Sequence, residues 1–277
     1  MDSSSQPASS PQRVKLQLKN TIGLELGGPS DIFSAGNLFP IYPLAQRIDN
    51  CNFASKTEWA ENHIAGPTFV FDENKQPGHQ YIREARDLSD FASVSYDFVC
   101  SSHTLEHCAN PIRALRECSR VLKSDGYLFL VLPHKDETFD HKRPVTKLDH
   151  LIADFENDVD EADLTHLPEI LALHDLSMDP MAGSREQFRA RSLQNCENRC
   201  LHHHVFDTAL AARLVDHCGF QILSVTQAAP YHIIVCAQKL NAGVAPDNAR
   251  FISRQALCYL NSPFASDRAS DRDSDSP

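Results

Sequence analysis

A glycine-rich turn at residues 23–30, with the sequence Gly-Leu-Glu-Leu-Gly-Gly-Pro-Ser, is the sharpest local motif of this chain. A short apolar run leads into Gly27 and Gly28, and Ser30 or Asp31 can cap the segment that follows. Two successive glycines let the backbone approach a ligand, and free N–H groups there suit an anion. A strand followed by two glycines is also common as a plain tight turn, so both interpretations stay open.

Two aspartates follow the glycine turn where the next two strands are expected to end. Asp49 lies 22 positions after Gly27, close to the spacing of about 20 residues at which a carboxylate accepts hydrogen bonds from a ribose diol. Asp87 could accept from an adenine amino group while Leu88 touches the ring. Asp49 could instead be a turn residue or a cap before Asn50, and Asp87 could be a helix cap. Three matching positions in order favour a site for an adenosine-containing ligand.

Histidines follow two later strands, at the edge where open α/β sheets bind ligands. His103 ends the fourth expected strand, and His134, Asp136 and His141 follow the fifth. A neutral imidazole could take a proton from a hydroxyl or an amine near neutral pH. Each histidine could equally be bonded to a loop carbonyl. We predict a catalytic base among His103, His134 and His141 without choosing one of them.

A second cluster combines thiols and imidazoles in the sequence Cys196-Glu-Asn-Arg-Cys200-Leu-His-His-His204. Cysteines four apart on a helix, together with imidazoles, could bind zinc. The Cys-x-x-x-Cys spacing is not that of the usual zinc knuckles, and in an extended segment His203 points away from His202 and His204. We therefore assign no metal and predict that this segment forms a wall of the substrate pocket.

Alternating apolar segments predict the elements that position these residues. Short runs typical of buried parallel strands cover residues 22–26, 46–49, 81–85, 96–100 and 127–132. An amphipathic helix is predicted over 111–122, and Ser124-Asp-Gly126 should turn the chain into the next strand. This order is that of a βαβ unit with a right-handed crossover.

The last third of the chain predicts a helix and a hairpin. Asp207 is a good N-cap for a helix that Gly219 ends. The apolar runs 220–225 and 231–237 follow, and strands so close in sequence must pair antiparallel. The sheet is therefore expected to be mostly parallel, with an antiparallel end.

Residues 20–135 resemble the central half of the class I S-adenosylmethionine-dependent methyltransferases. The resemblance rests on Asp87-Leu-Ser-Asp-Phe, on Tyr96-Asp-Phe-Val-Cys-Ser-Ser-His-Thr-Leu-Glu-His107 and on residues 111–133, and it is weaker over 200–240. It implies an α/β fold that is Rossmann-like and doubly wound, with a mostly parallel seven-stranded sheet. It also implies S-adenosylmethionine as cofactor and methyl transfer as the reaction. An antiparallel hairpin at the end of the sheet is typical of this family, whereas simple dinucleotide dehydrogenases end parallel.

The resemblance implies roles for residues at matching positions. The cofactor contacts carried over in this way are Glu25, Gly27 and Gly28 at the methionine end, Asp49 at the ribose, Asp87 and Leu88 at the adenine, and Ser101, Ser102 and His103 beneath the sulfonium. The family's glycine turn usually has a third glycine, where this chain has Gly-Gly-Pro-Ser. Holding the acceptor about 3 Å from the methyl carbon provides much of the rate, so a dedicated base is not required.

Composition narrows the choice of partners. The 277 residues carry a formal charge of −11, which would repel a nucleic-acid backbone. The longest apolar run is far below the roughly 20 residues of a membrane helix, and the first residues do not resemble a secretory signal. Nine cysteines without a Cys-x-x-Cys pair suit a reducing compartment. We expect a cytoplasmic enzyme that methylates oxygen or nitrogen of a small-molecule or sugar-like acceptor, with no nucleic-acid or membrane partner.

The chain is expected to form one methyltransferase-like domain over residues 14–240. Disorder is predicted for 1–13 and, within the extension 241–277, for the Ser- and Asp-rich tail from Ser262 onward. Residues 133–205 are polar and too long for a plain loop, so we predict a helical insertion over the cleft, with helices at 167–176 and 185–193.

Two other classes of protein stay open. A catalytically inert methyltransferase-like module could act through partners, because a fold alone does not certify activity. An NAD-dependent oxidoreductase is less favoured, because Gly27-Gly-Pro-Ser-Asp-Ile32 lacks the Gly-x-Gly-x-x-Gly fingerprint. The sequence does not predict an oligomeric state.

Overall fold

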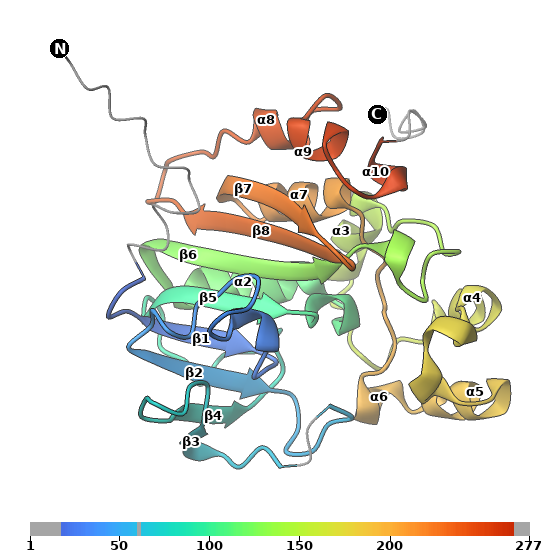
Figure 1. Cartoon of the computed structure of the whole chain (residues 1–277), viewed down its shortest axis with the longest axis horizontal. Helices are drawn as coiled ribbons and strands as arrows, with labels where there is room; N and C mark the ends of the chain where they lie inside the picture. Colours follow the sequence, from blue (N-terminus) through green and yellow to red (C-terminus); the bar gives the residue numbers. More distant parts are fainter. Residues whose placement is uncertain (1–17, 60–61, 269–277) are drawn as a thin grey trace.

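The computed structural model describes residues 18–59 and 62–268. One eight-stranded sheet, in the order β3-β4-β2-β1-β5-β6-β8-β7, runs through the protein (Figure 1). The strands are β1 (Ile22–Leu26), β2 (Arg47–Asn52), β3 (Gly66–Phe69), β4 (Gly78–Ile82), β5 (Tyr96–Ser102), β6 (Leu122–Pro133), β7 (Phe220–Ala228) and β8 (His232–Lys239). The helices are α2 (Pro111–Val121), α3 (Leu148–Glu156), α4 (Leu167–Leu173), α5 (Arg185–Leu193), α6 (Asn195–Asn198), α7 (Thr208–His217), α8 (Ala249–Ile252), α9 (Leu257–Leu260) and α10 (Ala265–Arg268).

The strand directions confirm the predicted topology. β4, β2, β1, β5 and β6 are parallel, whereas β8 pairs antiparallel with both β6 and β7. The eighth strand is β3, a short antiparallel edge strand whose side chains are mostly exposed, so it lacks the buried apolar run that predicts a strand. The bounds of several strands differ from those predicted: β2 runs to Asn52, β4 begins at Gly78, and β6 begins at Leu122, so the turn predicted at 124–126 lies within β6.

One face of the sheet is covered by α2, α3 and α7. Leu115 of α2 and Leu214 of α7 are fully buried against β-strand residues such as Leu24 and Leu130. The helix ends follow the predicted signals, because the Asp207 side chain accepts from the Leu210 N–H at 2.7 Å and Gly219, at φ +80°, follows α7.

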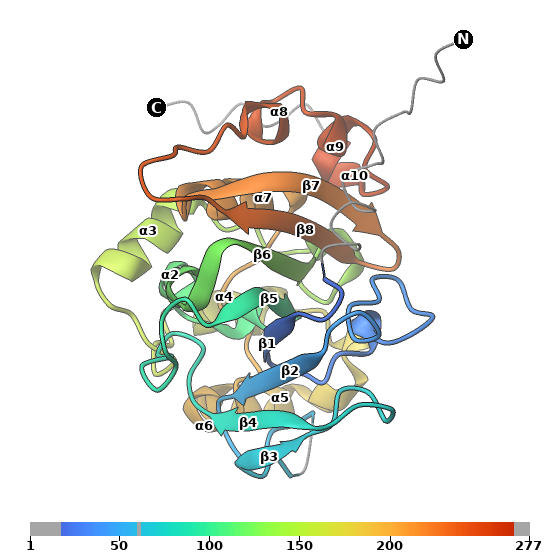
Figure 2. The ribbon, with the colours of Figure 1, turned by 90° about the vertical axis from the view of Figure 1, so that its left-hand side faces the viewer.

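The other face is covered by the segment 27–46, which contains no α-helix and only the short 3-10 turn Asp31–Phe33 (Figure 2). Aromatic side chains fill this face: the Phe33 ring packs edge-on against Tyr42 at 5.9 Å, and Phe39 against Phe129 at 5.5 Å. Prolines at 40 and 43 remove backbone donors that a helix would need. Within residues 18–59 and 62–268, the α-helices that cover the sheet lie on one face, whereas the doubly wound arrangement implied helices on both.

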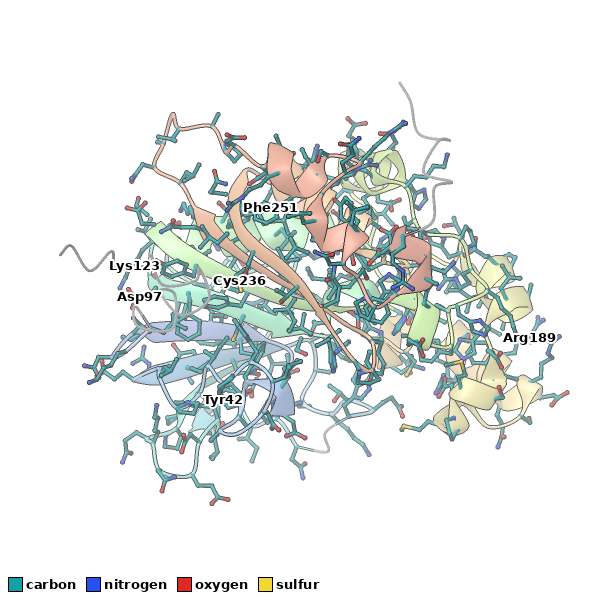
Figure 3. All side chains as sticks on the ribbon, turned by 45° about the horizontal axis from the view of Figure 1, so that its top comes forward. Tyr42, Asp97, Lys123, Arg189, Cys236 and Phe251 are labelled. Carbon is teal, nitrogen blue, oxygen red and sulfur yellow. The ribbon has the colours of Figure 1, made fainter. Side chains whose placement is uncertain are left out.

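The amino ends of the central strands are fastened on the side opposite the site described below. Asp97 at the start of β5 pairs with Lys123 at the start of β6, with 2.7 Å between Oδ1 and Nζ (Figure 3). The other oxygen of Asp97 accepts from the N–H of Ile22, the first residue of β1, at 2.9 Å. Three neighbouring strands are thus held in register at that end.

The segment between β6 and α7 places α4, α5 and α6 beyond the carboxyl ends of the strands (Figure 1). The predicted helices at 167–176 and 185–193 correspond to α4, which ends at Leu173, and to α5. Ser184 and Gln187 form a capping box at the start of α5. The sequence did not predict α3, which packs on α2 and α7 instead of over the strand ends.

The carboxyl-terminal segment 262–268 packs on the domain, which differs from the disorder predicted from Ser262 onward. Phe264 stacks on His134 with ring centroids 4.0 Å apart. Asp267 is buried and accepts from the hydroxyls of Thr208 and Ser262, both at 2.5 Å. Composition did not predict this ordered segment, because a network of polar hydrogen bonds and a single aromatic ring hold it in place. The rest of the predicted disorder, at 1–13 and 269–277, lies outside the described residues.

Among the helices of the described ranges, none is long and apolar enough to cross a membrane.

Candidate functional site

A cleft of about 950 Å³ lies at the carboxyl ends of β1, β2, β4 and β5. This edge of a parallel sheet is where open α/β folds bind ligands. Residues that follow the strands form its floor, and residues of the 133–205 segment form its far wall. The floor includes Gly27, Gly28, Asn52, Arg83, Glu84, Ser102 and His103, and the wall includes Phe139, Met178, Met181, Arg199, Cys200 and His202.

The two glycines at the end of β1 are required by the backbone and by their surroundings. Gly27 and Gly28 have φ of +79° and +78°, in the left-handed region that favours glycine. A Cβ on Gly27 would lie closer than 3.0 Å to the Thr104 hydroxyl, and one on Gly28 equally close to the Glu25 carboxylate. The turn therefore brings bare backbone to the cleft, as predicted. The Gly27 N–H, however, donates to the Cys51 carbonyl at 2.9 Å and is not free for an anion.

Glu25 supports this turn from below and does not line the cleft. It is fully buried, and its Oε2 accepts from the Tyr42 hydroxyl at 2.7 Å, while the Tyr42 oxygen accepts from the Ser30 N–H at 2.7 Å (Figure 3). Burial raises the pKa of Glu25 to about 8. Its Oε1 has no hydrogen-bond partner among the described residues. Glu25 was predicted to contact the cofactor, whereas in the structure it lies beneath the glycine turn and supports it.

Asp49 does not reach the cleft, contrary to its predicted ribose role. Its carboxylate is buried and accepts from the Tyr96 hydroxyl at 3.0 Å and the His79 N–H at 2.9 Å. The reason is that β2 continues three residues past Asp49, so that Asn52 lines the cleft at the end of this strand.

Asp87 and Leu88 are also outside the cleft, contrary to the predicted adenine contacts. Asp87 is exposed and accepts from the Ser89 N–H at 3.1 Å in a turn, and it caps no helix, because none lies between β4 and β5. Leu88 is fully buried in the core. Because β4 ends at Ile82, the residues at its carboxyl end that line the cleft are Arg83 and Glu84.

Residues after β5 divide between core and cleft. Ser101 is buried, donates to the Leu26 carbonyl at 3.2 Å and does not line the cleft. Ser102 and His103 do line the cleft. His103 Nε2 lies 2.9 Å from Nδ1 of His232, and its Nδ1 lies 3.5 Å from Oε1 of the buried Glu106. These three side chains form a continuous chain from the protein interior into the cleft.

Electrostatics keep the two ends of this chain in different forms. Burial opposes ionisation of Glu106, but the hydrogen bond from His103 and the neighbouring imidazoles of His107 and His202 hold its pKa below the usual value. Burial, followed by repulsion from His103, lowers the pKa of His232 to about 4. At neutral pH Glu106 is therefore a carboxylate and His232 a neutral imidazole.

Two of the three predicted catalytic histidines lie away from the cleft. His134 is fully buried, stacks on Phe264 and has its Nε2 3.2 Å from Oδ1 of Asp267. His141 Nε2 lies 2.9 Å from Oδ2 of Asp175 on the insertion. Both rings are engaged by carboxylates outside the cleft, so only His103 keeps a place in the predicted base group.

The thiol and imidazole cluster does not converge on one point. Cys196 is exposed, Cys200 lines the cleft, and His202 Nδ1 lies 2.5 Å from Oδ2 of Asp140. His204 instead has its Nε2 3.1 Å from the Ala109 carbonyl oxygen. The predicted pocket wall thus comprises Cys200 and His202, and the four residues considered for zinc do not form one site.

Sequence reasoning missed His232 and Glu106. The first opens β8 directly opposite Pro133, the last residue of β6. Because β8 is antiparallel, its first residue lies at the same edge as the last residues of its parallel neighbours, and this signal was available from the predicted hairpin. Glu106 lies within the quoted motif, but nothing in the sequence distinguishes it from a surface acid.

We compared the chain with known families and with curated proteins. Residues 67–130 match the family model described as a methyltransferase domain. No curated protein matches the chain.

The fold is similar to several solved structures. One is an S-adenosylmethionine-dependent methyltransferase from Methanosarcina mazei, with 18% identity, a TM-score of 0.45, and 80% of this chain and 93% of that chain covered. Another, from Aquifex aeolicus, has 12% identity, a TM-score of 0.38, and 83% and 89% covered. A third is 1,6-didemethyltoxoflavin-N1-methyltransferase from Burkholderia thailandensis, solved with 1,6-didemethyltoxoflavin and S-adenosylhomocysteine, with 11% identity, a TM-score of 0.45, and 84% and 79% covered.

The strand order, parallel with an antiparallel end, confirms the predicted Rossmann-like fold. The match to a methyltransferase domain over residues 67–130 agrees with the predicted class of enzyme and with S-adenosylmethionine as its cofactor. Gly27 and Gly28, which bring bare backbone to the cleft, suit the close approach of such a cofactor.

Proposed function

We propose that this protein transfers the methyl group of S-adenosylmethionine to a hydroxyl or amine of a small-molecule or sugar-like acceptor. The observation that carries the proposal is the single cleft that joins the glycine turn and His103 to the wall of the insertion. Its volume of about 950 Å³ is near the upper end of the roughly 300–1,000 Å³ typical of small-molecule sites. This space would hold a cofactor together with a small acceptor.

We assign the cofactor to the floor of the cleft. Gly27 and Gly28 would approach its methionine portion, Asn52 its ribose, and Arg83 with Glu84 its adenine, because these residues stand at the ends of β1, β2 and β4. The turn is held rigid for this purpose, since the Asn52 amide donates to the Gly28 carbonyl at 3.3 Å. When bound, S-adenosylmethionine supplies an electrophilic methyl group.

The acceptor would lie between this floor and the insertion. The cleft there is lined by the aromatic side chains of Trp59 and Phe139 and by Cys200 and His202. Aromatic faces with a few convergent polar groups suit a compact polar molecule such as a saccharide. The acidic net charge of −11 favours such an acceptor over nucleic acid.

The chain of Glu106, His103 and His232 supplies a route for the acceptor proton. If Glu106 accepts the Nδ1 hydrogen of His103, then His103 Nε2 accepts the Nδ1 hydrogen of His232. The Nε2 lone pair of His232 is then the one that faces outward to take a proton from the acceptor. Onward transfer to His103 would place the positive charge beside the Glu106 carboxylate, which stabilises it.

Calorimetry and turnover test this proposal. The protein should bind about one S-adenosylmethionine per chain and no NADH. It should form S-adenosylhomocysteine with at least one acceptor in a panel of sugars, phenols and amines. His103→Gln should lower kcat while leaving cofactor binding intact, and the matched control His141→Gln, outside the cleft, should leave both unchanged. A protein that binds NADH and not S-adenosylmethionine would refute the proposal, as would cofactor binding without turnover across the whole panel.

A further inference from the structure

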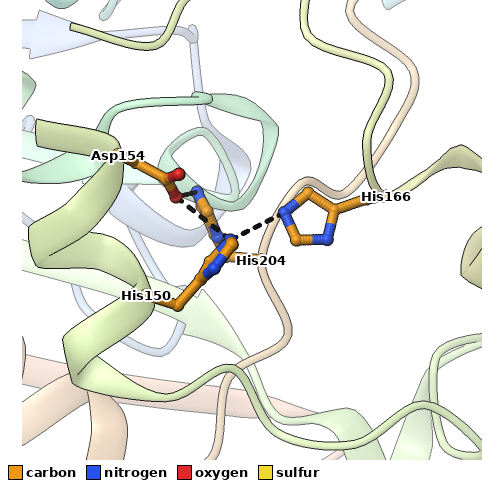
Figure 4. Close-up of side chains that lie close together, drawn as sticks. All are labelled: His150, Asp154, His166 and His204. Atoms are coloured by element: carbon orange, nitrogen blue, oxygen red, sulfur yellow. Dashed lines mark hydrogen bonds and ion pairs between the residues drawn. The ribbon is translucent and has the colours of Figure 1, made fainter. Parts of the chain in front are cut away.

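A cluster of three imidazoles and one carboxylate lies behind the cleft, where α3 meets two later segments of the insertion (Figure 4). His150 and Asp154 are one turn apart on α3, His166 precedes α4, and His204 lies at a bend in the loop before α7. One donor atom from each residue lies within 4.8 Å of every other. We propose that these four residues bind a divalent transition-metal ion, with Zn²⁺ as the best match, and that this ion fastens the later segments of the insertion to α3, which packs on the domain.

The spacing of the donor atoms suits tetrahedral coordination. His150 Nε2 lies 3.0 Å from His166 Nε2 and 3.3 Å from Oδ2 of Asp154. Asp154 Oδ2 lies 3.7 Å from His204 Nε2. Ligands bound to zinc at about 2.0–2.1 Å in a tetrahedron are about 3.3 Å apart, so small movements of His150, Asp154 and His166 would complete three positions. A turn of the His204 ring that brings Nδ1 to the place of Nε2 would complete the fourth.

Hydrogen bonding leaves this cluster with unused electron pairs. The carbonyl oxygen of Ala109 can only accept, so His204 carries its hydrogen on Nε2 and has a lone pair on Nδ1. That Nδ1 is buried and has no hydrogen-bond partner among the described residues, and the same holds for Asp154 Oδ2. Burial of unpaired acceptors is costly, and a cation would satisfy both.

The two remaining imidazoles face each other through their Nε2 atoms, 3.0 Å apart. One of these nitrogens carries the hydrogen between them and the other accepts it with its lone pair. A metal ion would take the place of this hydrogen, and both nitrogens would then be ligands.

The donor set selects the class of ion. Three imidazole nitrogens and one carboxylate oxygen are typical of zinc and unlike the all-oxygen sites of calcium and magnesium. Four protein ligands leave no open position, which is characteristic of a structural site. A second group, Glu106 with His107 and His202, is also closely spaced, but its members are engaged with His103, the Leu201 carbonyl and Asp140.

The consequence for the cleft follows from the positions of the ligands. His204 is two residues from His202, which lines the cleft, and α3 packs on α2 and α7. An ion held by His150, His166 and His204 would therefore fix the acceptor wall relative to the sheet. The metal site itself does not depend on methyl transfer, so its test and that of the proposed function fail separately.

Metal analysis of the full chain, purified without a polyhistidine tag, tests the inference. We expect about one Zn²⁺ per chain in the wild type and in the control His141→Gln, which alters another carboxylate-paired histidine of the insertion. The double variant His150→Gln/His166→Gln should retain less than a tenth of this zinc. With Zn²⁺ at 100 times its Kd, the wild type should gain about 5–10 °C in Tm, and the double variant should gain none.

Cobalt reports the geometry directly, because Zn²⁺ is spectroscopically silent. Titration of the metal-free wild type with Co²⁺ should give the visible absorption of a tetrahedral complex, and this band should be absent in the double variant. If the double variant does not fold by circular dichroism, the single variant His150→Gln is compared instead. The inference is overturned if the wild type takes up no Zn²⁺ or Co²⁺, or if uptake is the same in the folded variant.

Discussion

The buried carboxyl group of Glu25 leads to a quantitative prediction about stability. The group sits beneath the glycine turn, fully buried, and burial raises its pKa from 4.5 to about 8. The native protein therefore holds a proton that the unfolded chain releases at lower pH. Between these two values, stability falls as pH rises, because the unfolded state binds fewer protons than the native state.

Replacing Glu25 with glutamine removes this dependence while keeping the size of the side chain and an oxygen for the Tyr42 hydroxyl. The pKa interval corresponds to about 3–4 kcal/mol between pH 5 and pH 8. Glu25→Gln should therefore gain that amount relative to the wild type over this range. Urea unfolding at pH 5, 6, 7 and 8 measures the difference from the midpoints and slopes.

The control for lost negative charge is Glu73→Gln, which alters an exposed side chain. Its unfolding free energy should follow the wild-type profile to within about 0.5 kcal/mol at every pH. The reasoning is refuted if Glu25→Gln and the wild type give parallel profiles, because Glu25 would then ionise in the folded state as it does in the unfolded chain.

Three further predictions follow from the packing. Gly28→Ala should lower stability by clearly more than Gly36→Ala, in urea unfolding, and should weaken S-adenosylmethionine binding in calorimetry. Both residues have a positive φ, so an alanine at either position should cost roughly 1–2 kcal/mol for the left-handed backbone. Only at position 28 would the added Cβ also meet another side chain. Leu214→Ala should cost about 2–5 kcal/mol in the same unfolding assay, because the side chain is fully buried. Phe264→Ala should expose the segment 262–268 to limited proteolysis, whereas the exposed Leu257→Ala should not.

The sequence predicted the sheet better than what covers it. The approximate positions of the strands follow from apolar runs, and the antiparallel end follows from the short link between β7 and β8, and both are local signals. The covering of the second face by residues 27–46 depends on aromatic packing between distant segments, for which hydrophobic periodicity gives no sign.

The misplaced ribose and adenine residues share one physical cause. Both strands contain buried polar residues, which end an apolar pattern but not a strand. In β2, the Asn50 amide donates to the carbonyl oxygens of Glu25 and Gly27, and in β4 the Gln80 amide donates to Asn50 at 2.8 Å. Because these hydrogen-bond partners are distant in the sequence, the apolar pattern alone predicted that β2 ends at Asp49 and that β4 covers 81–85. The ribose and adenine contacts were therefore predicted at Asp49 and Asp87, which do not line the cleft.

The histidines that were predicted to be catalytic also depend on contacts with distant parts of the chain. His103, His134 and His141 all follow strands at the correct edge, yet only His103 lies in the cleft. His134 stacks on Phe264 and pairs with Asp267, and both partners lie in the tail for which composition predicts disorder. Spacing places a residue at an edge of the sheet, whereas the partner that engages its ring comes from elsewhere in the chain.

A crystal structure of the protein with S-adenosylhomocysteine would show where the cofactor binds. We expect the ligand in the cleft, with its amino-acid portion beside Gly27 and Gly28 and its adenosine toward Asn52 and Glu84. Density for the ligand beside Asp49 or Asp87, or on any surface away from the glycine turn, would contradict it.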